Sequence, residues 1–355
     1  MPENCGTLAA ARCLSDAGVE VWTASDRRVA PGAFSAAVTR RERCPGLQRP
    51  EAAVGWLLEL ARRRPGFVLY PTSDDWAWLQ AVHRKRLGEH FLTYTPAPEV
   101  VQAVLDKRLL HEHCRAVGLE TPETSFPETE ADATRVAKTM KAPVLLKQRT
   151  QILSHTHSKG RIVHRMDDLA ASFRAFVVEN PHARALEHRM PGASKPLVQA
   201  YFAEGVSGSL LVSGFVGESG ELFVARAARK VLQFPRRLGI ALCLDAIELD
   251  PDVGARIRAL CARVGYFGVF QVELLTVGER HLLIDFNPRY YHYLAFDVAR
   301  GMPLPRMVHA AATGDRAELE RLVRDAARDR GARAFAYGLQ LEELLFAQRL
   351  SGAMP

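Results

Sequence analysis

Three oxygen-bearing side chains lie close together in the sequence and could hold a hard metal ion. Glu273 ends the hydrophobic run FQVE, and Asp285 and Asn287 lie in the run LIDFN, with the short turn 276–280 between the two runs. This pattern is typical of a β-hairpin. Because side chains alternate along a strand, Asp285 and Asn287 would share a face, and Glu273 could lie beside them. Such a set suits Mg²⁺; the alternative is a half-buried strand with an acidic solvent-facing side.

Two basic residues could complete an anion site next to this hairpin. Arg289 follows Pro288 and could grip a phosphate or a carboxylate. Lys147 ends the apolar stretch 142–146, where a lysine must find an anion or extend to water. The next residues, 148–160, are rich in Thr, Ser, His and Lys and could fold over phosphates, although they lack the Walker pattern GxxxxGK[ST].

Lysine is rare in this chain, which makes its few positions informative. It occupies eight positions, and arginine fills the remaining basic ones. Lys107 lies at the start of a predicted amphipathic helix over residues 101–118, and Lys230 stands in the run RKVLQFP. Each of these two lysines, taken alone, is most often a surface charge.

The elements that must position these residues change character along the chain. Residues 1–100 alternate between helical and strand patterns, which predicts a parallel α/β domain. Its first strand is absent from the pattern, because the first helix begins only a few residues after Met1. The helix 101–118 and a second α/β unit follow, up to residue 205. Within the next unit, 206–318, residues 208–295 are mainly antiparallel, with strands at 209–216, 222–228, 268–276 and 281–286 and a helix at 251–264. Residues 319–355 form a helical tail.

Composition and charge favour a cytoplasmic enzyme. The 355 residues suffice for two or three domains, and 48% hydrophobic and 25% charged residues are ordinary for a soluble protein. No run reaches the ~20 apolar residues of a membrane span, and the start is no secretory signal. The six cysteines form no CxxC pair, so neither zinc nor disulfides are expected. The net charge of +7 is scattered, which does not favour nucleic acid as a partner.

The order of these motifs resembles that of the ATP-grasp superfamily, in the group related to carbamoyl-phosphate synthetase and D-aspartate ligase. The resemblance spans nearly the whole chain. It rests on the following segments in order: DKRLL at 106–110 with GLETP at 118–122, VLLK at 144–147, VQAYFAEG at 198–205, RKVLQFP at 229–235, and LIDFNPR at 283–289. The last of these is the most specific.

The resemblance implies an ATP-grasp fold, α/β and α+β, preceded by a Rossmann-like pre-ATP-grasp domain over 1–100. The ATP-grasp part would be divided into 101–205 and 206–318. Its cofactors would be ATP and Mg²⁺, for which Mn²⁺ could substitute. The implied nucleotide-binding residues are Lys107, Lys147, Gln199, Tyr201, Phe202, Glu204 and Lys230. The implied metal ligands are Glu273, Asp285 and Asn287, and the implied catalytic residues are Arg289 and Lys230.

Three positions depart from the family pattern. Ala200 replaces the usual glutamate of the adenine-binding segment, and Gln148 replaces the proline that commonly follows the lysine. Asp285 replaces glutamate, which shortens that metal ligand by one methylene. The backbone contacts to adenine do not depend on these side chains, whereas the metal geometry does.

The implied reaction is the ATP-dependent joining of a carboxylate to an amine through an acylphosphate. The partners would be a small carboxylate and an amine, such as amino acids, and a homodimer is one possible assembly. Two alternatives remain open: a bicarbonate-activating carboxylase or carbamoyl-forming enzyme, and a non-catalytic nucleotide-binding protein of the same fold. These motifs do not identify the substrates.

Overall fold

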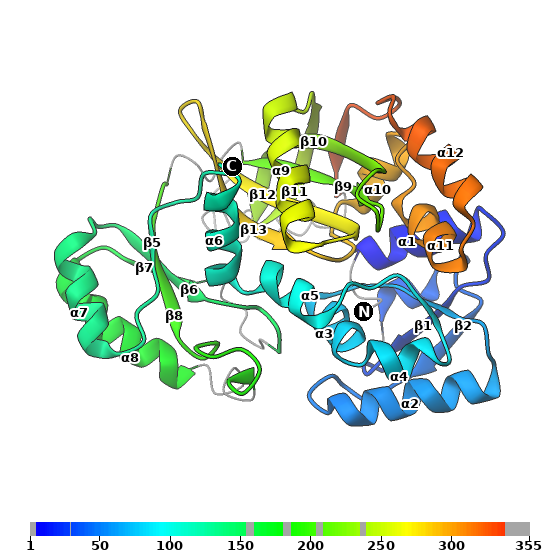
Figure 1. The fold of residues 1–355 in the computed structure, drawn as a ribbon, viewed down its shortest axis with the longest axis horizontal. Helices are drawn as coiled ribbons and strands as arrows, with labels where there is room; N and C mark the ends of the chain where they lie inside the picture. Colours follow the sequence, from blue (N-terminus) through cyan, green and yellow to red (C-terminus); the bar gives the residue numbers. More distant parts are fainter. Residues whose placement is uncertain are drawn as a thin grey trace, which may run out of the picture.

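The computed structural model describes residues 5–28, 30–153, 160–179, 186–203, 209–234 and 239–337. A small lobe with its own sheet lies at one end of the molecule, a larger antiparallel sheet lies in the middle, and the N-terminal region packs at the other end (Figure 1). Glu204 and residues 154–159, which are part of the polar segment 148–160, lie outside the described residues. No helix in the described ranges is both long and apolar enough to cross a membrane.

The N-terminal region has the expected alternation of helices and strands. Its strands pair in parallel, β1 with β2 and β3 with β4, but they form two separate pairs instead of one sheet. The helix over 74–82 begins at Ser73, whose hydroxyl accepts a hydrogen bond from the Trp76 N–H at 3.2 Å. The elements are α1 Cys5–Ser15, β1 Trp22–Ser25, η1 Pro31–Phe34, β2 Arg40–Arg43, α2 Pro50–Arg63, β3 Val68–Leu69, α3 Asp74–Val82, α4 Arg84–Gly88 and β4 Leu92–Thr93.

The single helix expected over residues 101–118 is wrong. The structure has two helices, α5 Pro98–Leu105 and α6 Lys107–Ala116. Asp106 separates them in an extended conformation, with its carboxylate accepting hydrogen bonds from the N–H groups of Arg108 at 2.8 Å and Leu109 at 3.4 Å. An aspartate that caps a helix in this way starts a new helix inside a continuous amphipathic pattern. Lys107 is therefore the first residue of α6.

The small lobe is a four-stranded antiparallel sheet with helices on one face. The strand order is β5-β8-β6-β7. Leu146 and Val198 point to the face that packs on the helices, so Leu145 and Lys147 point to the opposite face. The elements are β5 Thr124–Ser125, α7 Glu130–Thr139, β6 Val144–Gln148, β7 Arg161–Val163, η2 Met166–Asp168, α8 Leu169–Glu179 and β8 Pro196–Ala200.

The central sheet is antiparallel and has the order β13-β12-β9-β10-β11-β14. Two of its strands, β11 and β14, were not expected, and β10 runs six residues past its expected end at 228. Neither β11 nor the end of β10 alternates cleanly between buried and exposed residues, which explains the omission. The strands are β9 Leu210–Val216, β10 Phe223–Phe234, β11 Ile240–Ile247, β12 Gly268–Val277, β13 Arg280–Asn287 and β14 Ala334–Ala336.

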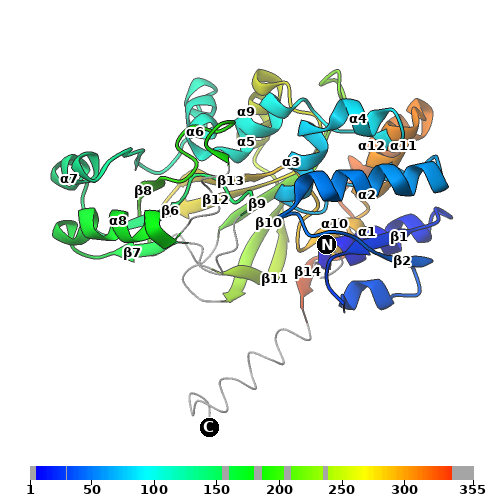
Figure 2. The same cartoon turned by 90° about the horizontal axis from the view of Figure 1, so that it is seen from below.

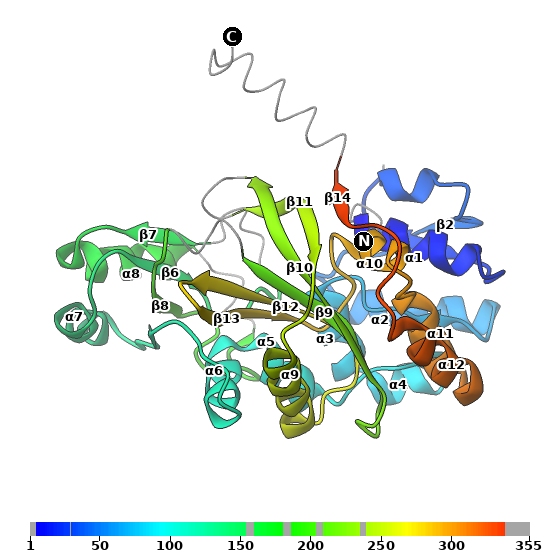
Figure 3. The same cartoon turned by 90° about the horizontal axis from the view of Figure 1, so that it is seen from above.

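Helices cover both faces of this sheet. One apolar cluster joins α5 and α9 to the face that carries Val212, Val272 and Phe286. A second cluster joins α1 and the late helices to the face that carries Leu211 and Phe215. Figures 2 and 3 show the two groups of helices on opposite sides. The remaining helices are α9 Pro251–Val264, α10 Leu294–Ala299, α11 Leu304–Thr313 and α12 Arg316–Ala326. Helix α12 crosses the expected boundary at 318, and the expected helical tail contains β14.

Candidate nucleotide and metal site

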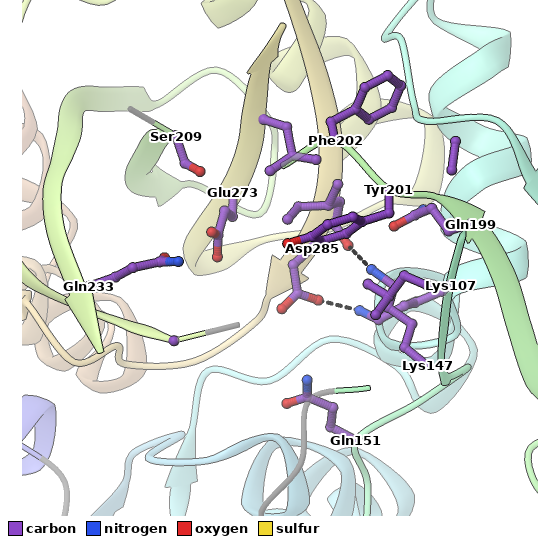
Figure 4. A pocket seen from close by; sticks show the side chains of 15 residues that line it. Lys107, Lys147, Gln151, Gln199, Tyr201, Phe202, Ser209, Gln233, Glu273 and Asp285 are labelled. Atoms are coloured by element: carbon purple, nitrogen blue, oxygen red, sulfur yellow. Dashed lines mark hydrogen bonds and ion pairs between the residues drawn. The ribbon is translucent and has the colours of Figure 1, made fainter. Parts of the chain in front are cut away.

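A cavity lies between the small lobe and the edge of the central sheet (Figure 4). It encloses about 740 Å³ of space, part of it open to solvent. Its floor is β12 and β13, and its opposite wall comes from β6, β8 and the start of α6. The lining residues are Lys107, Leu145, Lys147, Gln151, Gln199, Ala200, Tyr201, Phe202, Ser209, Gln233, Gly239, Glu273, Leu275, Ile284 and Asp285.

The expected hairpin is present, and it places two carboxylates in this cavity. Strands β12 and β13 pair so that Glu273 lies opposite Asp285, and a bulge follows directly after Glu273. Figure 4 shows both side chains directed into the cavity from neighbouring strands. The period of two and the short turn therefore predicted this juxtaposition correctly.

The third proposed metal ligand, Asn287, lies on the same strand but is engaged by its neighbours. Its Nδ2 donates to Oε1 of Gln271 at 2.7 Å, and its Oδ1 accepts from Nη2 of Arg289 at 2.8 Å. Neither Asn287 nor Arg289 is among the described residues that line the cavity. The amide oxygen would have to leave Arg289 before it could bind a metal ion.

Three lysines bring positive charge to the two carboxylates. Lys107 forms an ion pair with Asp285, and Lys230 forms one with Glu273. Lys230 is only 4% exposed and also donates to Oε1 of Gln233 at 3.1 Å. Lys147 donates to the carbonyl oxygen of Ile284 at 3.3 Å, so it extends across the cavity from the small lobe to β13. The structure thus brings together all three lysines and both carboxylates that the sequence singled out.

The segment expected to hold adenine lines the same cavity. Gln199 donates from Nε2 to the Thr124 hydroxyl at 2.9 Å, and the Tyr201 N–H donates to the carbonyl of Pro143 at 3.2 Å. These bonds hold the end of β8 in place at the cavity wall. Phe202 follows and also lines the cavity, whereas the adjacent Glu204, the candidate for the ribose, lies outside the described residues.

Sequence reasoning missed the apolar walls of the cavity. Leu145 comes from the small lobe, and Leu275 and Ile284 come from the hairpin. A flat aromatic base could lie between such surfaces and exclude water. Leu145 lies two residues before Lys147, and the alternation along β6 was the signal that could have identified it.

The N-terminal region contributes two neighbouring carboxylates, Asp74 and Asp75, at the start of α3, which sequence reasoning did not single out. Arg289 donates from Nε to Oδ1 of Asp74 at 2.9 Å. Asp75 accepts a hydrogen bond from the Leu153 N–H at 2.7 Å. Burial raises the pKa of Asp75 to about 6, although that hydrogen bond and the nearby Arg289 oppose the rise. Their position shortly after the end of β3, at the start of α3, was the signal that could have marked these two acids as candidate site residues.

A buried arginine, also missed, holds the small lobe to α6. Arg149 is fully buried, and its Nη2 lies 2.5 Å from Oε1 of Glu128. Its carbonyl oxygen accepts a hydrogen bond from the Lys107 N–H at 2.9 Å. The positions of Lys107 and Lys147 are therefore fixed by one connected backbone segment, β6 and Arg149 directly after it.

No protein-family model matches the chain. Among curated proteins, the large chain of carbamoyl phosphate synthase from Rubrobacter xylanophilus is 23% identical over 267 residues, which are 73% of this chain and 24% of that protein. The chain thus spans about a quarter of the length of this curated relative.

Three solved structures have a similar fold. The biotin carboxylase of Campylobacter jejuni, in a complex named for β,γ-ATP, is 14% identical with a TM-score of 0.66, over 88% of this chain and 69% of that one. The biotin carboxylase domain of the Hydrogenobacter thermophilus 2-oxoglutarate carboxylase, with MgADP, ADP and bicarbonate, is 15% identical with a TM-score of 0.66, over 88% and 68%. The L-amino acid ligase of Bacillus licheniformis is 12% identical with a TM-score of 0.64, over 88% and 72%.

At these identities a structural likeness shows a shared fold. The order of the motifs, the sheet that carries the two carboxylates and the three solved structures agree with one another. The expectation from the sequence is confirmed, and the chain has the ATP-grasp fold.

Proposed function

We propose that this chain is an ATP-dependent ligase that joins a carboxylate to an amine and releases ADP and phosphate. The observation that carries the proposal is the cavity in which Lys107 and Lys230 pair with Asp285 and Glu273 under a third lysine. Such a cavity holds charge of both signs away from bulk water, which suits a metal–polyphosphate complex. The likeness to an L-amino acid ligase supports the same reaction class.

The residues fit Mg-ATP by the chemistry of their side chains. Carboxylate and amide oxygens are the ligands that Mg²⁺ takes, and Glu273, Asp285 and Asn287 would provide them. Bound Mg²⁺ would neutralise part of the charge on the phosphate oxygens. The apolar surfaces of Leu145 and Ile284 would enclose the base, next to the backbone of 199–202.

Binding would require the ion pairs of the cavity to exchange partners. Lys107 and Lys230 now satisfy the two carboxylates, because a buried carboxylate without a partner is strongly destabilised. The phosphates would take over the lysines while the metal ion takes over the carboxylates. Every charge then keeps a partner in both states, so the exchange leaves no buried charge uncompensated.

The transfer step needs the γ-phosphoryl group and the attacking carboxylate held in line. In this account the substrate carboxylate oxygen attacks the γ-phosphorus, the bond from phosphorus to the ADP oxygen breaks, and the amine then displaces phosphate. Arg289 would orient the oxyanion, since Asp74 and Asn287 fix its guanidinium from two sides. Lys230 would stabilise charge that develops on the transferred group.

A second function has support from the solved structures. Two of them are biotin carboxylases, one with bicarbonate present, and the curated relative is a carbamoyl phosphate synthase. The same cavity could activate bicarbonate instead of an organic carboxylate, because both present an oxygen nucleophile to the γ-phosphorus. The two functions differ in whether an amine is needed.

A substrate screen separates these functions. Purified protein with Mg-ATP is incubated with single amino acids and small carboxylates, each with and without an amine, and phosphate release and product mass are recorded. We expect phosphate release that requires both a carboxylate and an amine, with a product lighter than the sum of the two by one water. ADP release that depends on bicarbonate alone would favour the second function. ATP binding without turnover across the whole panel would contradict both.

A further inference from the structure

A second large cavity lies in the N-terminal region, on one face of the β1–β2 pair. It encloses about 790 Å³ of space, part of it open to solvent. Strands β1 and β2 lie at the end of the molecule opposite the small lobe (Figure 1), and this cavity shares no lining residue with the nucleotide cavity. Its lining residues are Thr23, Ser25, Arg27, Arg28, Ala30, Ala33, Phe34, Arg41, Glu42 and Arg43.

Positive charge dominates this second cavity. Four arginines line it, and three of them, Arg28, Arg41 and Arg43, form no ion pair with any residue in the described ranges. Glu42 is the one acid among the described lining residues, and its Oε1 lies 2.8 Å from Nε of Arg40. Guanidinium groups that share a concave surface repel one another, and an anion between them would remove that repulsion.

Arginines elsewhere in the N-terminal region include both paired and unpaired side chains. Arg62 lies 2.9 Å from Glu59 on an exposed helix surface. Arg63 and Arg84 are also exposed, and they form no ion pair within the described ranges. The cavity arginines therefore differ in position: they share one concave surface, where their like charges face one another.

A buried hydroxyl points to the same conclusion independently. Thr23 is 9% exposed, and its Oγ1 has no hydrogen-bond partner within the part of the chain that the structure describes. In the parallel register Thr23 lies opposite Arg41, so the hydroxyl and the guanidinium share one face of the strand pair. A buried hydroxyl without a partner is unfavourable, and it could donate to an oxyanion held by the arginine.

We propose that this cavity is a second ligand site, which binds a small molecule through a phosphate or carboxylate group. Guanidinium groups bind both oxyanions in a bidentate manner. The position also fits, because ligands of open parallel sheets bind beyond the carboxyl ends of the strands, where Arg27, Arg28 and Arg43 lie. Phe34 is 63% exposed at this cavity and lies 4.5 Å from the Arg41 guanidinium, so the ligand could also carry a flat or apolar part.

Calorimetric titration tests the proposal. Inorganic phosphate and succinate serve as probes of the two oxyanions, with sodium chloride matching the ionic strength. Mg²⁺ and a non-hydrolysable ATP analogue are held at saturation, so that the nucleotide cavity is filled up to its γ-phosphate position. The wild type is compared with the double variant Arg41→Gln/Arg43→Gln, with Thr23→Val and with the control Arg62→Gln, which removes an exposed and paired arginine from α2.

We expect the double variant to bind the preferred probe at least tenfold more weakly than the wild type. Thr23→Val should bind it about threefold more weakly, and Arg62→Gln should bind it as the wild type does. Tighter binding of phosphate identifies a phosphorylated ligand, and tighter binding of succinate identifies a carboxylate. Equal affinity in the wild type and the double variant, or no binding by the wild type, would overturn the proposal. Both arginines are exposed, and an unchanged thermal unfolding midpoint in each variant confirms that the fold is intact.

Discussion

Two buried clusters of opposite charges lie on the central sheet, and they are built from different cations. The nucleotide cavity uses lysines, and two of them, Lys107 and Lys230, each form an ion pair with one carboxylate. The second cluster packs against residues 326–330 and contains Arg226 and Arg300, which both form ion pairs with Asp329. There the two guanidiniums also donate to main-chain carbonyls, such as Ala326 and Ala227, both at 2.9 Å.

The difference indicates what each cluster does. A lysine holds its partner through one flexible ammonium group, so another anion can replace that partner. A guanidinium with several fixed acceptors loses all of them together, and Arg300 is only 1% exposed. The first arrangement permits exchange of ligands, and the second anchors the 326–330 segment to the sheet. Variants in the first cluster should therefore affect ATP chemistry, and variants in the second should affect stability.

The largest expected effect is on the first cluster. Glu273→Gln removes a metal ligand but keeps the size of the side chain and an oxygen for Lys230. ADP formation should fall by roughly 10³-fold, about 4 kcal/mol of transition-state stabilisation. The rate of ADP release is the measurement, and Glu279→Gln, in the exposed turn of the same hairpin, is the matched control. If Glu273→Gln released ADP at the wild-type rate, Glu273 would not be a metal ligand of this site.

The second cluster should respond in stability alone. Asp329→Asn removes the carboxylate that both guanidiniums share and leaves Arg300 only its longer ion pair with Asp297, at 3.6 Å. The free energy of unfolding should fall by about 2–3 kcal/mol. Urea denaturation measures this loss. ADP formation by the folded variant should stay within about twofold of the wild type, because no cavity residue contacts Asp329. A large loss of activity without destabilisation would contradict the division between the clusters.

A third prediction concerns Asp75, the acid that joins the N-terminal region to the segment after β6. Burial raises its pKa to about 6, above its ordinary value near 4, so the folded protein binds this proton more tightly than the unfolded chain does. Stability from this group is therefore present at low pH and is lost as the pH rises through about 6. Asp75→Asn should flatten the decline in unfolding free energy between pH 4.5 and 7.5 by about 2 kcal/mol. The same decline in both proteins would exclude Asp75 as its source.

The smallest expected effect is on Lys147. Lys147→Met keeps the unbranched shape and most of the length of the side chain but removes the charge proposed to contact phosphate, and ATP should bind about tenfold more weakly, or about 1.4 kcal/mol. Equilibrium titration with ATP measures the change. Lys138→Met, at an exposed position on α7, should bind ATP as the wild type does. Equal affinities in both variants would mean that Lys147 does not contact the phosphates.

The hairpin was predictable because its signal is local. Two apolar runs and a short turn place Glu273 opposite Asp285 without reference to the rest of the chain. The helix break at Asp106 was not recognised, because a capping aspartate is hard to distinguish from a solvent-facing one inside a helical pattern.

Contacts between segments that are far apart in the sequence could not be predicted from it. Asp74 meets Arg289 across 215 positions, and the second cavity depends on how η1 packs over β1 and β2. Arg149 was missed for the same reason, since its burial depends on Glu128 and on the segment around Pro191. Periodicity predicts which face a residue occupies, but it does not predict which distant face packs against it.

In the proposed function, Glu273 and Asp285 exchange their lysine partners for a metal ion when ATP binds. Equilibrium binding of ATP with and without Mg²⁺, to the wild type and to Glu273→Gln, tests this exchange most directly. We predict that Mg²⁺ strengthens ATP binding to the wild type at least tenfold, and that it changes binding to the variant by less than threefold. An equal effect of Mg²⁺ on both proteins, or no ATP binding by the wild type, would contradict the exchange.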